Sequence, residues 1–160
     1  MAVALEKIRS SLMTGIVTCC GLGFFPKGSG TIASFFATGF WVLLLELDVP
    51  RWFIILLTLL ITVFGTFAIQ AYEKRTKTHD GSEIVIDEWV GMGISLWFIK
   101  LNLPYIIAAF VLFRLFDIWK PPGVKYFDDH HLNSWGVMID DVVAGLYATI
   151  LIGAYRLWVG

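Results

Sequence analysis

Acidic side chains are the residues of this 160-residue chain most able to carry out chemistry, because several fall within or beside strongly apolar stretches. An ionisable group near the centre of a bilayer costs at least about 2.5–3.5 kcal/mol, so such groups must be paired, solvated or bound to a cation. The alternative is that they are solvated helix ends. We favour a functional cluster formed by Asp87, Glu88, Asp117, Asp140 and Asp141.

A divalent cation would suit this cluster, because carboxylate oxygens are the hard ligands that Mg²⁺ prefers. The three histidines and two cysteines show no zinc-site spacing. Glu83 and Asp87 are four residues apart and are expected on one face of a helix. The sequence therefore predicts a Mg²⁺ site with ligands drawn from Glu83, Asp87, Glu88, Asp140 and Asp141.

A glycine-rich segment directly before the first apolar stretch has the composition of an anion site. It combines a cation, two hydroxyl groups and the N-terminus of an expected helix, whose free N–H groups and dipole favour phosphate. The alternative is ordinary helix punctuation, since such a turn also begins helices that bind nothing. The candidate phosphate-binding residues here are Lys27, Gly28, Ser29, Gly30 and Thr31.

Two further cations lie at the end of the fourth apolar stretch. Arg114 and Asp117 are three residues apart, a spacing that predicts an ion pair on one helix face. Lys120 follows and is placed to meet a phosphate group. We expect Arg114 and Lys120 to bind substrate, and Asp87, Asp117 and Asp140 to be catalytic.

Apolar windows long enough to cross a bilayer indicate how these residues are positioned. Residues 1–25 repeat apolar side chains at helical spacing beside charges, which favours a helix along the membrane interface. Very short links at 47–50 and 100–104 predict antiparallel hairpins. We expect one all-α membrane domain, residues 1–160, with an N-terminal interfacial helix and about five membrane-spanning helices at 31–47, 51–72, 84–100, 103–119 and 138–159.

Composition supports a membrane protein and argues against nucleic-acid binding. The chain is 58% hydrophobic and 16% charged, with mean hydropathy +0.76 and formal net charge −1, so it lacks the basic field that holds nucleic acid. More lysines and arginines lie on the same side of the spans as the N-terminus than on the other side, and this excess favours a cytoplasmic N-terminus. That orientation brings the carboxylate cluster to the cytoplasmic face. A proton or cation transporter remains an alternative, but its acidic groups should lie at several depths.

Four motifs together resemble the phosphatidylglycerophosphatase A family: 26–31 (PKGSGT), 86–91 (IDEWVG), 113–121 (FRLFDIWKP) and 136–145 (GVMIDDVVAG). The resemblance implies a Mg²⁺-dependent phosphatase that converts phosphatidylglycerophosphate to phosphatidylglycerol and phosphate at the cytoplasmic face of the bacterial inner membrane. Asp80-Gly81 also begins like a CDP-alcohol phosphotransferase motif, but the rest of that motif is missing. A cysteine phosphatase is excluded because no arginine follows Cys19 or Cys20 at the required spacing.

Overall fold

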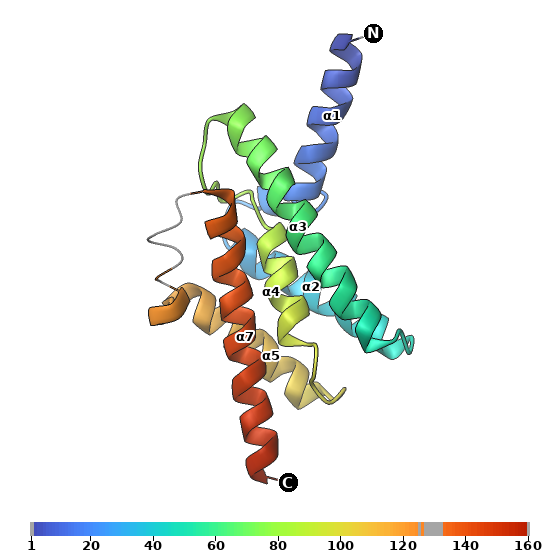
Figure 1. Ribbon diagram of the computed structural model, residues 1–160, viewed down its shortest axis with the longest axis vertical. Helices are drawn as coiled ribbons and strands as arrows, with labels where there is room; N and C mark the ends of the chain where they lie inside the picture. Colours follow the sequence, from blue (N-terminus) through green and yellow to red (C-terminus); the bar gives the residue numbers. More distant parts are fainter. Residues whose placement is uncertain (1, 125, 127–132, 160) are drawn as a thin grey trace.

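The computed structural model describes residues 2–124, 126 and 133–159, without the side chains of residues 2–5, 7 and 9. Helices dominate this part of the chain, and no strand occurs in it, as expected for an all-α protein. Figure 1 shows their arrangement. The elements are α1 (Ala2–Val17), η1 (Leu22–Phe24), α2 (Ser29–Glu46), α3 (Arg51–Thr76), α4 (Ile86–Ser95), α5 (Leu103–Trp119) and α7 (Ser134–Val159).

Among the described residues, three helices are long and apolar enough to cross a membrane: α2, α3 and α7. The expected span at 84–100 is wrong, because α4 has ten residues and rises only about 15 Å, half the thickness of the hydrocarbon core. Its N-cap, Val85, has non-helical backbone angles, and the helix ends at Ser95. Helix α5 matches the expected window, but its 17 residues rise only about 26 Å.

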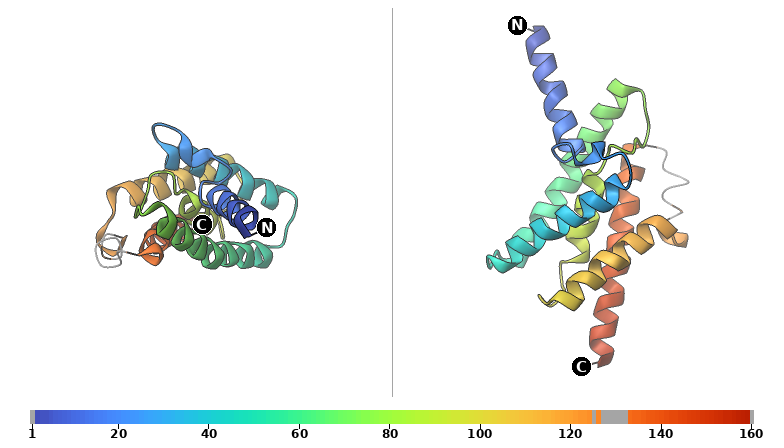
Figure 2. Two further views of the ribbon diagram at one scale, coloured as in Figure 1. Left: turned by 90° about the horizontal axis from the view of Figure 1, so that it is seen from above. Right: turned by 180° about the vertical axis from the view of Figure 1, so that it is seen from behind.

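Short helix α4 lies at the centre of the bundle. It stands between α3 and α7 in Figure 1, while α2 and α5 cross behind it, as the right view of Figure 2 shows. Most of its residues are buried, including both glycines, Gly91 and Gly93. A helix that contacts protein on all sides has no need to span the bilayer on its own.

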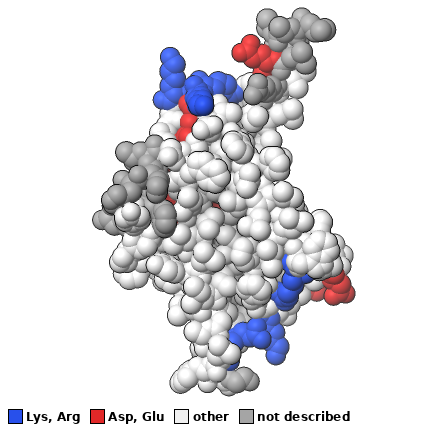
Figure 3. All heavy atoms as spheres, viewed as in Figure 1, with Lys and Arg blue, Asp and Glu red and all other residues white. Residues whose placement is uncertain are grey.

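The outer surface has the properties of a lipid-facing surface. Large apolar side chains such as Phe35, Leu59 and Phe64 are exposed on α2 and α3. On the face shown in Figure 3, charged side chains gather towards the upper and lower ends, and the belt between them is almost entirely uncharged. This distribution supports membrane association.

Three carbonyl groups beyond the C-terminal end of α4 receive hydrogen bonds from arginines of α3 and α7. Arg51, at the start of α3, donates to the carbonyls of Trp97 (2.7 Å) and Ile99 (3.0 Å). Arg156, near the end of α7, donates to the carbonyl of Phe98 (3.0 Å). Non-helical backbone at membrane depth requires such internal partners, and these bonds fix the end of α4 that lies away from its acidic residues.

Helix α1 is present as predicted from residues 1–25, and it packs along α3. Arg75 donates to the carbonyl of Ser10 (3.1 Å) and to the hydroxyl of Thr14 (2.7 Å). Its N-terminal part projects away from the bundle in Figure 1. The position of α1 at a membrane interface stays a prediction.

Glycines bring α4 and α7 into close contact. A Cβ atom on Gly145 would lie 2.5 Å from the carbonyl oxygen of Gly91. A Cβ atom on Gly91 would meet the ring of Phe113 and would lie 2.9 Å from the carbonyl oxygen of Asp141. Small residues at both positions therefore set the distance between the two helices.

We predict that Gly145→Ala lowers the free energy of unfolding by about 1–3 kcal/mol, because the added methyl group meets rigid backbone. The matched control is Gly153→Ala in the same helix, where a Cβ atom meets nothing within 4 Å. Thermal unfolding of the detergent-solubilised variants measures the difference. Equal unfolding temperatures for the two variants would contradict the close packing of α4 against α7.

Candidate active site

A polar pocket of about 370 Å³ opens where four helices and one loop meet. The N-terminus of α2, the loop before α4, the first turn of α4, the C-terminal half of α5 and the first turns of α7 all contribute to it. Its charged lining residues are Asp80, Asp87, Glu88, Arg114, Asp117, Lys120, Asp140 and Asp141. Most of the expected functional side chains are thus brought together, although they are distributed over the chain.

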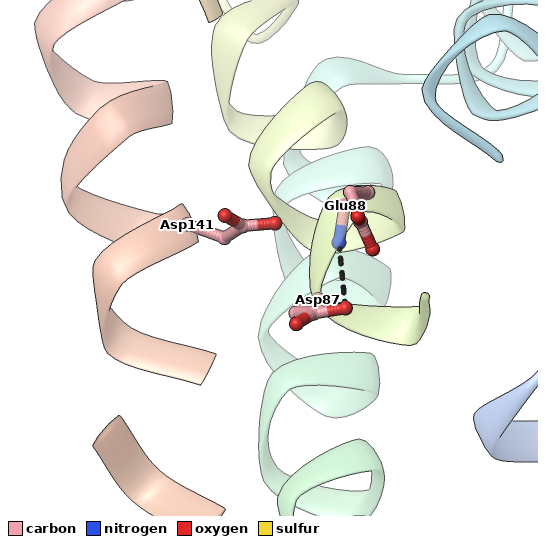
Figure 4. Close-up of side chains that lie close together, drawn as sticks. All are labelled: Asp87, Glu88 and Asp141. Atoms are coloured by element: carbon pink, nitrogen blue, oxygen red, sulfur yellow. Dashed lines mark hydrogen bonds between the residues drawn. The ribbon is translucent and has the colours of Figure 1, made fainter. Parts of the chain in front are cut away.

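Three carboxylates form the centre of this site. Asp87 and Glu88 lie in the first turn of α4, and Asp141 projects from α7 towards them, as Figure 4 shows. Each residue offers one oxygen such that the three oxygens lie within 4.8 Å of one another. We call Asp87, Glu88 and Asp141 the carboxylate trio.

The trio is buried and incompletely satisfied. Asp87 is 8% exposed and Asp141 is 3% exposed. One oxygen of Asp87 accepts a hydrogen bond from the backbone N–H of Glu88 (3.1 Å). Glu88 Oε2 and Asp141 Oδ2 are buried and find no hydrogen-bond partner in the described part of the chain. Buried carboxylate oxygens without partners are costly, and a hard divalent cation would satisfy them, so the donor set fits Mg²⁺.

Each cation in the pocket is paired with an acidic side chain. Arg114 forms the predicted ion pair with Asp117 (2.7 Å) and lies 3.8 Å from Glu88. Lys120, which follows α5, contacts Asp140 at 3.1 Å. Asp140 therefore turns towards α5 while its neighbour Asp141 turns towards α4.

The N-terminus of α2 supplies one wall of the pocket through Gly28, Ser29 and Gly30. A Cβ atom on Gly30 would collide with the carboxylate of Glu88 and would lie 3.3 Å from a guanidinium nitrogen of Arg114. The Ser29 hydroxyl donates to the carbonyl of Ser82 (2.8 Å), which attaches α2 to the opposite loop. Gly30 thus makes room for the charged groups at a helix N-terminus.

Three expected site residues do not line this pocket. Lys27 and Thr31 are exposed and do not belong to its lining. Glu83 is also absent from the lining, and its side chain accepts a hydrogen bond from the Tyr72 hydroxyl (3.0 Å). The expectation that Glu83 and Asp87 share one helix face is wrong, because α4 begins only at Ile86.

Sequence reasoning missed the loop that closes the pocket, formed by Asp80, Gly81 and Ser82. Glu73 at the end of α3 holds this loop. It accepts hydrogen bonds from the backbone N–H of Asp80 (3.1 Å) and from the hydroxyl of Ser134 (2.5 Å), and it contacts His79 Nδ1 at 2.6 Å. An Asp-Gly pair is typical of a turn, but this pattern does not indicate a place beside the trio.

The nearby cysteine is not suited to act as a nucleophile. Burial raises the pKa of the Cys19 thiol to about 12, and the negative charges of Asp87 and Glu88 add to this effect. Its sulfur lies 3.6 Å from the carbonyl oxygen of Val85, which it can use as a hydrogen-bond acceptor. Because only a thiolate attacks efficiently, Cys19 stays inert at neutral pH, in agreement with the exclusion of cysteine phosphatases.

We predict that Asp141→Asn stabilises the protein when divalent cations have been removed by a chelator. Two like charges at most 4.8 Å apart repel by at least about 3 kcal/mol at an effective dielectric constant of 20, and the amide removes one charge from the trio. The unfolding temperature should rise by a few degrees relative to the wild type. Asp48→Asn, which changes an exposed acidic residue in the loop before α3, is the control and should have no effect. A lower unfolding temperature for Asp141→Asn in chelator would refute repulsion within the trio.

Comparisons with known proteins place the chain among enzymes. The family model described as Phosphatidylglycerophosphatase A matches residues 15–156. The proteins named phosphatidylglycerophosphatase A from Haemophilus influenzae and Escherichia coli are 40% and 36% identical to this chain, over 139 and 127 residues. These alignments cover 86% and 79% of this chain, and 85% and 73% of the relatives.

A third relative carries a different name. A protein of Bacteroides thetaiotaomicron named putative phosphatidylinositol-3-phosphatase is 39% identical over 159 residues, which cover 96% of this chain and 98% of the relative. No solved structure matches the chain. Because the family match extends over most of the chain and includes the residues of the pocket, this protein belongs to the phosphatidylglycerophosphatase A family, a family of phosphatases.

Proposed function

We propose that this protein hydrolyses phosphatidylglycerophosphate to phosphatidylglycerol and inorganic phosphate in a reaction that depends on Mg²⁺. The observation that carries the proposal is the buried carboxylate trio, Asp87, Glu88 and Asp141, in one pocket with Arg114 and Lys120. A site that offers both hard oxygen ligands and fixed cations matches a phosphate group bound together with a metal ion. The family membership supports the substrate.

The carboxylate trio would hold the cation. Glu88 Oε2 and Asp141 Oδ2 are buried without a hydrogen-bond partner in the described residues, so they are the ligand oxygens that a cation would stabilise most. Mg²⁺, when bound, would supply positive charge that offsets the negative charge developing on the phosphate oxygens. The protein's task is to keep these oxygens in place and to limit their access to bulk water.

The opposite wall of the pocket would bind the phosphate. Arg114 presents a rigid, always protonated fork of donors, and its ion pair with Asp117 (2.7 Å) orients that fork. Lys120 is held in the same way by Asp140 (3.1 Å). The backbone N–H groups at the N-terminus of α2 add a favourable dipole beside Gly28 and Gly30. In this proposal Asp117 and Asp140 act by positioning the two cations.

Hydrolysis joins a water oxygen to phosphorus and breaks the bond between phosphorus and the glycerol oxygen, which leaves as an alcohol. A carboxylate must accept the proton of the attacking water. We assign this role to Asp87, which lies in the pocket: one of its oxygens would bind the cation and the other would accept the proton.

The charge distribution supports a proposal for where the reaction takes place. We propose that the pocket faces the cytoplasm from the bacterial inner membrane, because Lys74, Arg75 and Lys77 lie at the end of α3 nearest the pocket-closing loop. A phosphomonoester headgroup at this level would reach the pocket while its acyl chains stay in the bilayer.

The direct test is phosphate release by purified protein from a panel of lipid phosphomonoesters, with Mg²⁺ and with excess chelator. The panel should contain phosphatidylglycerophosphate, phosphatidic acid and phosphatidylinositol 3-phosphate, the last because of the Bacteroides relative's name. We expect phosphatidylglycerophosphate to be the preferred substrate and chelator to abolish turnover.

Asp87→Asn and Asp140→Asn should lower kcat at least about 100-fold while remaining folded, because the amides preserve shape and remove charge.

Controls and alternatives are built into the same assay. Cys19→Ser should keep near wild-type activity. Lys120→Ala should raise KM, and Lys27→Ala should do so less, because Lys27 does not line the pocket.

Full activity in chelator would refute the metal assignment. CMP release from a CDP-lipid would instead indicate a CDP-alcohol phosphotransferase, and cation flux in liposomes without phosphate release would indicate a transporter.

A further inference from the structure

Two cavities away from the catalytic pocket lie at the opposite end of the bundle, next to the C-terminal end of α7. One, of about 650 Å³, is a groove between α5 and α7 with an almost wholly apolar lining that includes Ala108, Leu112 and Leu151. The other, of about 670 Å³, includes Lys100 and Arg156. Tyr105 lines both cavities, so they adjoin and form one amphipathic site.

The site is remote from the catalytic pocket. Along α7, Arg156 lies 15 residues beyond Asp141, which corresponds to a rise of about 22 Å. The two sites therefore lie towards opposite faces of the membrane in the orientation proposed above. A lipid bound at one of them would leave the other open.

Within the described residues, no acidic side chain pairs with the two cations at the polar end of the site. Neither Lys100 nor Arg156 takes part in an ion pair within the described residues, and both side chains are exposed. Arg156 donates through Nη1 to the carbonyl of Phe98 (3.0 Å), which fixes its guanidinium group and leaves its other nitrogen atoms for a ligand. Two such cations beside one cavity attract a phosphate group.

The apolar end of the site has the features of an acyl-chain groove at a membrane interface. Trp158 is 83% exposed and Tyr155 is 54% exposed, and both line the groove near its charged end. Aromatic side chains with a polar tip are typical of the headgroup level of a bilayer. An apolar groove that opens at this level next to two cations matches a molecule with a hydrocarbon chain and an anionic headgroup.

We propose that this site binds one anionic phospholipid, with its phosphate between Lys100 and Arg156 and an acyl chain in the groove between α5 and α7. Because helix α5 also carries Arg114 and Asp117, a lipid here would support the helix that positions the substrate-binding cations. The proposal is independent of the catalytic assignment, since none of its residues lines the catalytic pocket.

Native mass spectrometry of the purified protein with equal concentrations of phosphatidylglycerol and phosphatidylcholine tests the proposal. We expect the wild type to retain phosphatidylglycerol in preference. Removal of either cation, in Lys100→Ala or Arg156→Ala, should weaken retention about fivefold, which is the contribution expected of one basic residue near an anionic lipid. Ala154→Phe, which places a ring in the groove, should weaken the retention of both lipids.

The matched control is Lys74→Ala, which removes an exposed lysine at the end of α3 near the catalytic pocket. It should retain phosphatidylglycerol as the wild type does. Phosphatidylglycerol bound only in the catalytic pocket would be retained equally by Lys100→Ala, Arg156→Ala and the wild type, and that result would overturn the proposal. Equal retention of the two lipids by the wild type would also overturn it. Phosphate release by Lys100→Ala in detergent should be unchanged, so failure of this proposal leaves the catalytic assignment intact.

Discussion

Mutual repulsion among three buried carboxylates is the constraint on which the rest of this structure depends. Asp87, Glu88 and Asp141 bring oxygens within 4.8 Å of one another, and two of their oxygens have no hydrogen-bond partner in the described residues. Such an arrangement opposes folding unless a cation or protons compensate for it. The fold therefore has to hold α4 against α7 by other means, and the packing around the site is organised to do so.

Helix α4 is held firmly because it is short, central and fixed at both ends. Because Gly91 and Gly145 carry no side chain, the backbones of α4 and α7 can lie in direct contact. Arg51 and Arg156 donate hydrogen bonds to the carbonyls that follow the C-terminal end of α4. At its other end, Glu73 holds the pocket-closing loop to α3 and to Ser134 of α7. These contacts supply the rigidity that a preorganised site requires, since they keep like charges together.

Much of this organisation could be predicted from the sequence, and the part that could not has a physical reason. Ionisable residues in apolar stretches cost free energy, and this cost indicated that Asp87, Asp117 and Asp141 belong to a functional site. The three-residue spacing indicated the ion pair between Arg114 and Asp117. Hydropathy could not reveal that α4 is a ten-residue central helix, because a segment buried in protein is as apolar as one that faces lipid. For the same reason Glu83 was wrongly placed on a helix with Asp87. The sequence predicted a cluster that includes Glu88 and Asp141, but which of its carboxylates meet depends on tertiary packing, which spacing along the chain does not encode.

The central claim is that the carboxylate trio binds a divalent cation, and Mn²⁺ used as a paramagnetic substitute for Mg²⁺ tests it most directly. Electron paramagnetic resonance measures the free Mn²⁺ that remains when the ion is titrated with purified protein in detergent. The wild type should remove Mn²⁺ from solution and release it when Mg²⁺ is added in excess. The folded double variant Glu88→Gln, Asp141→Asn should remove at least tenfold less at the same concentration, because amides lack the charge that a hard cation requires. Equal Mn²⁺ binding by the wild type and the double variant would contradict the account.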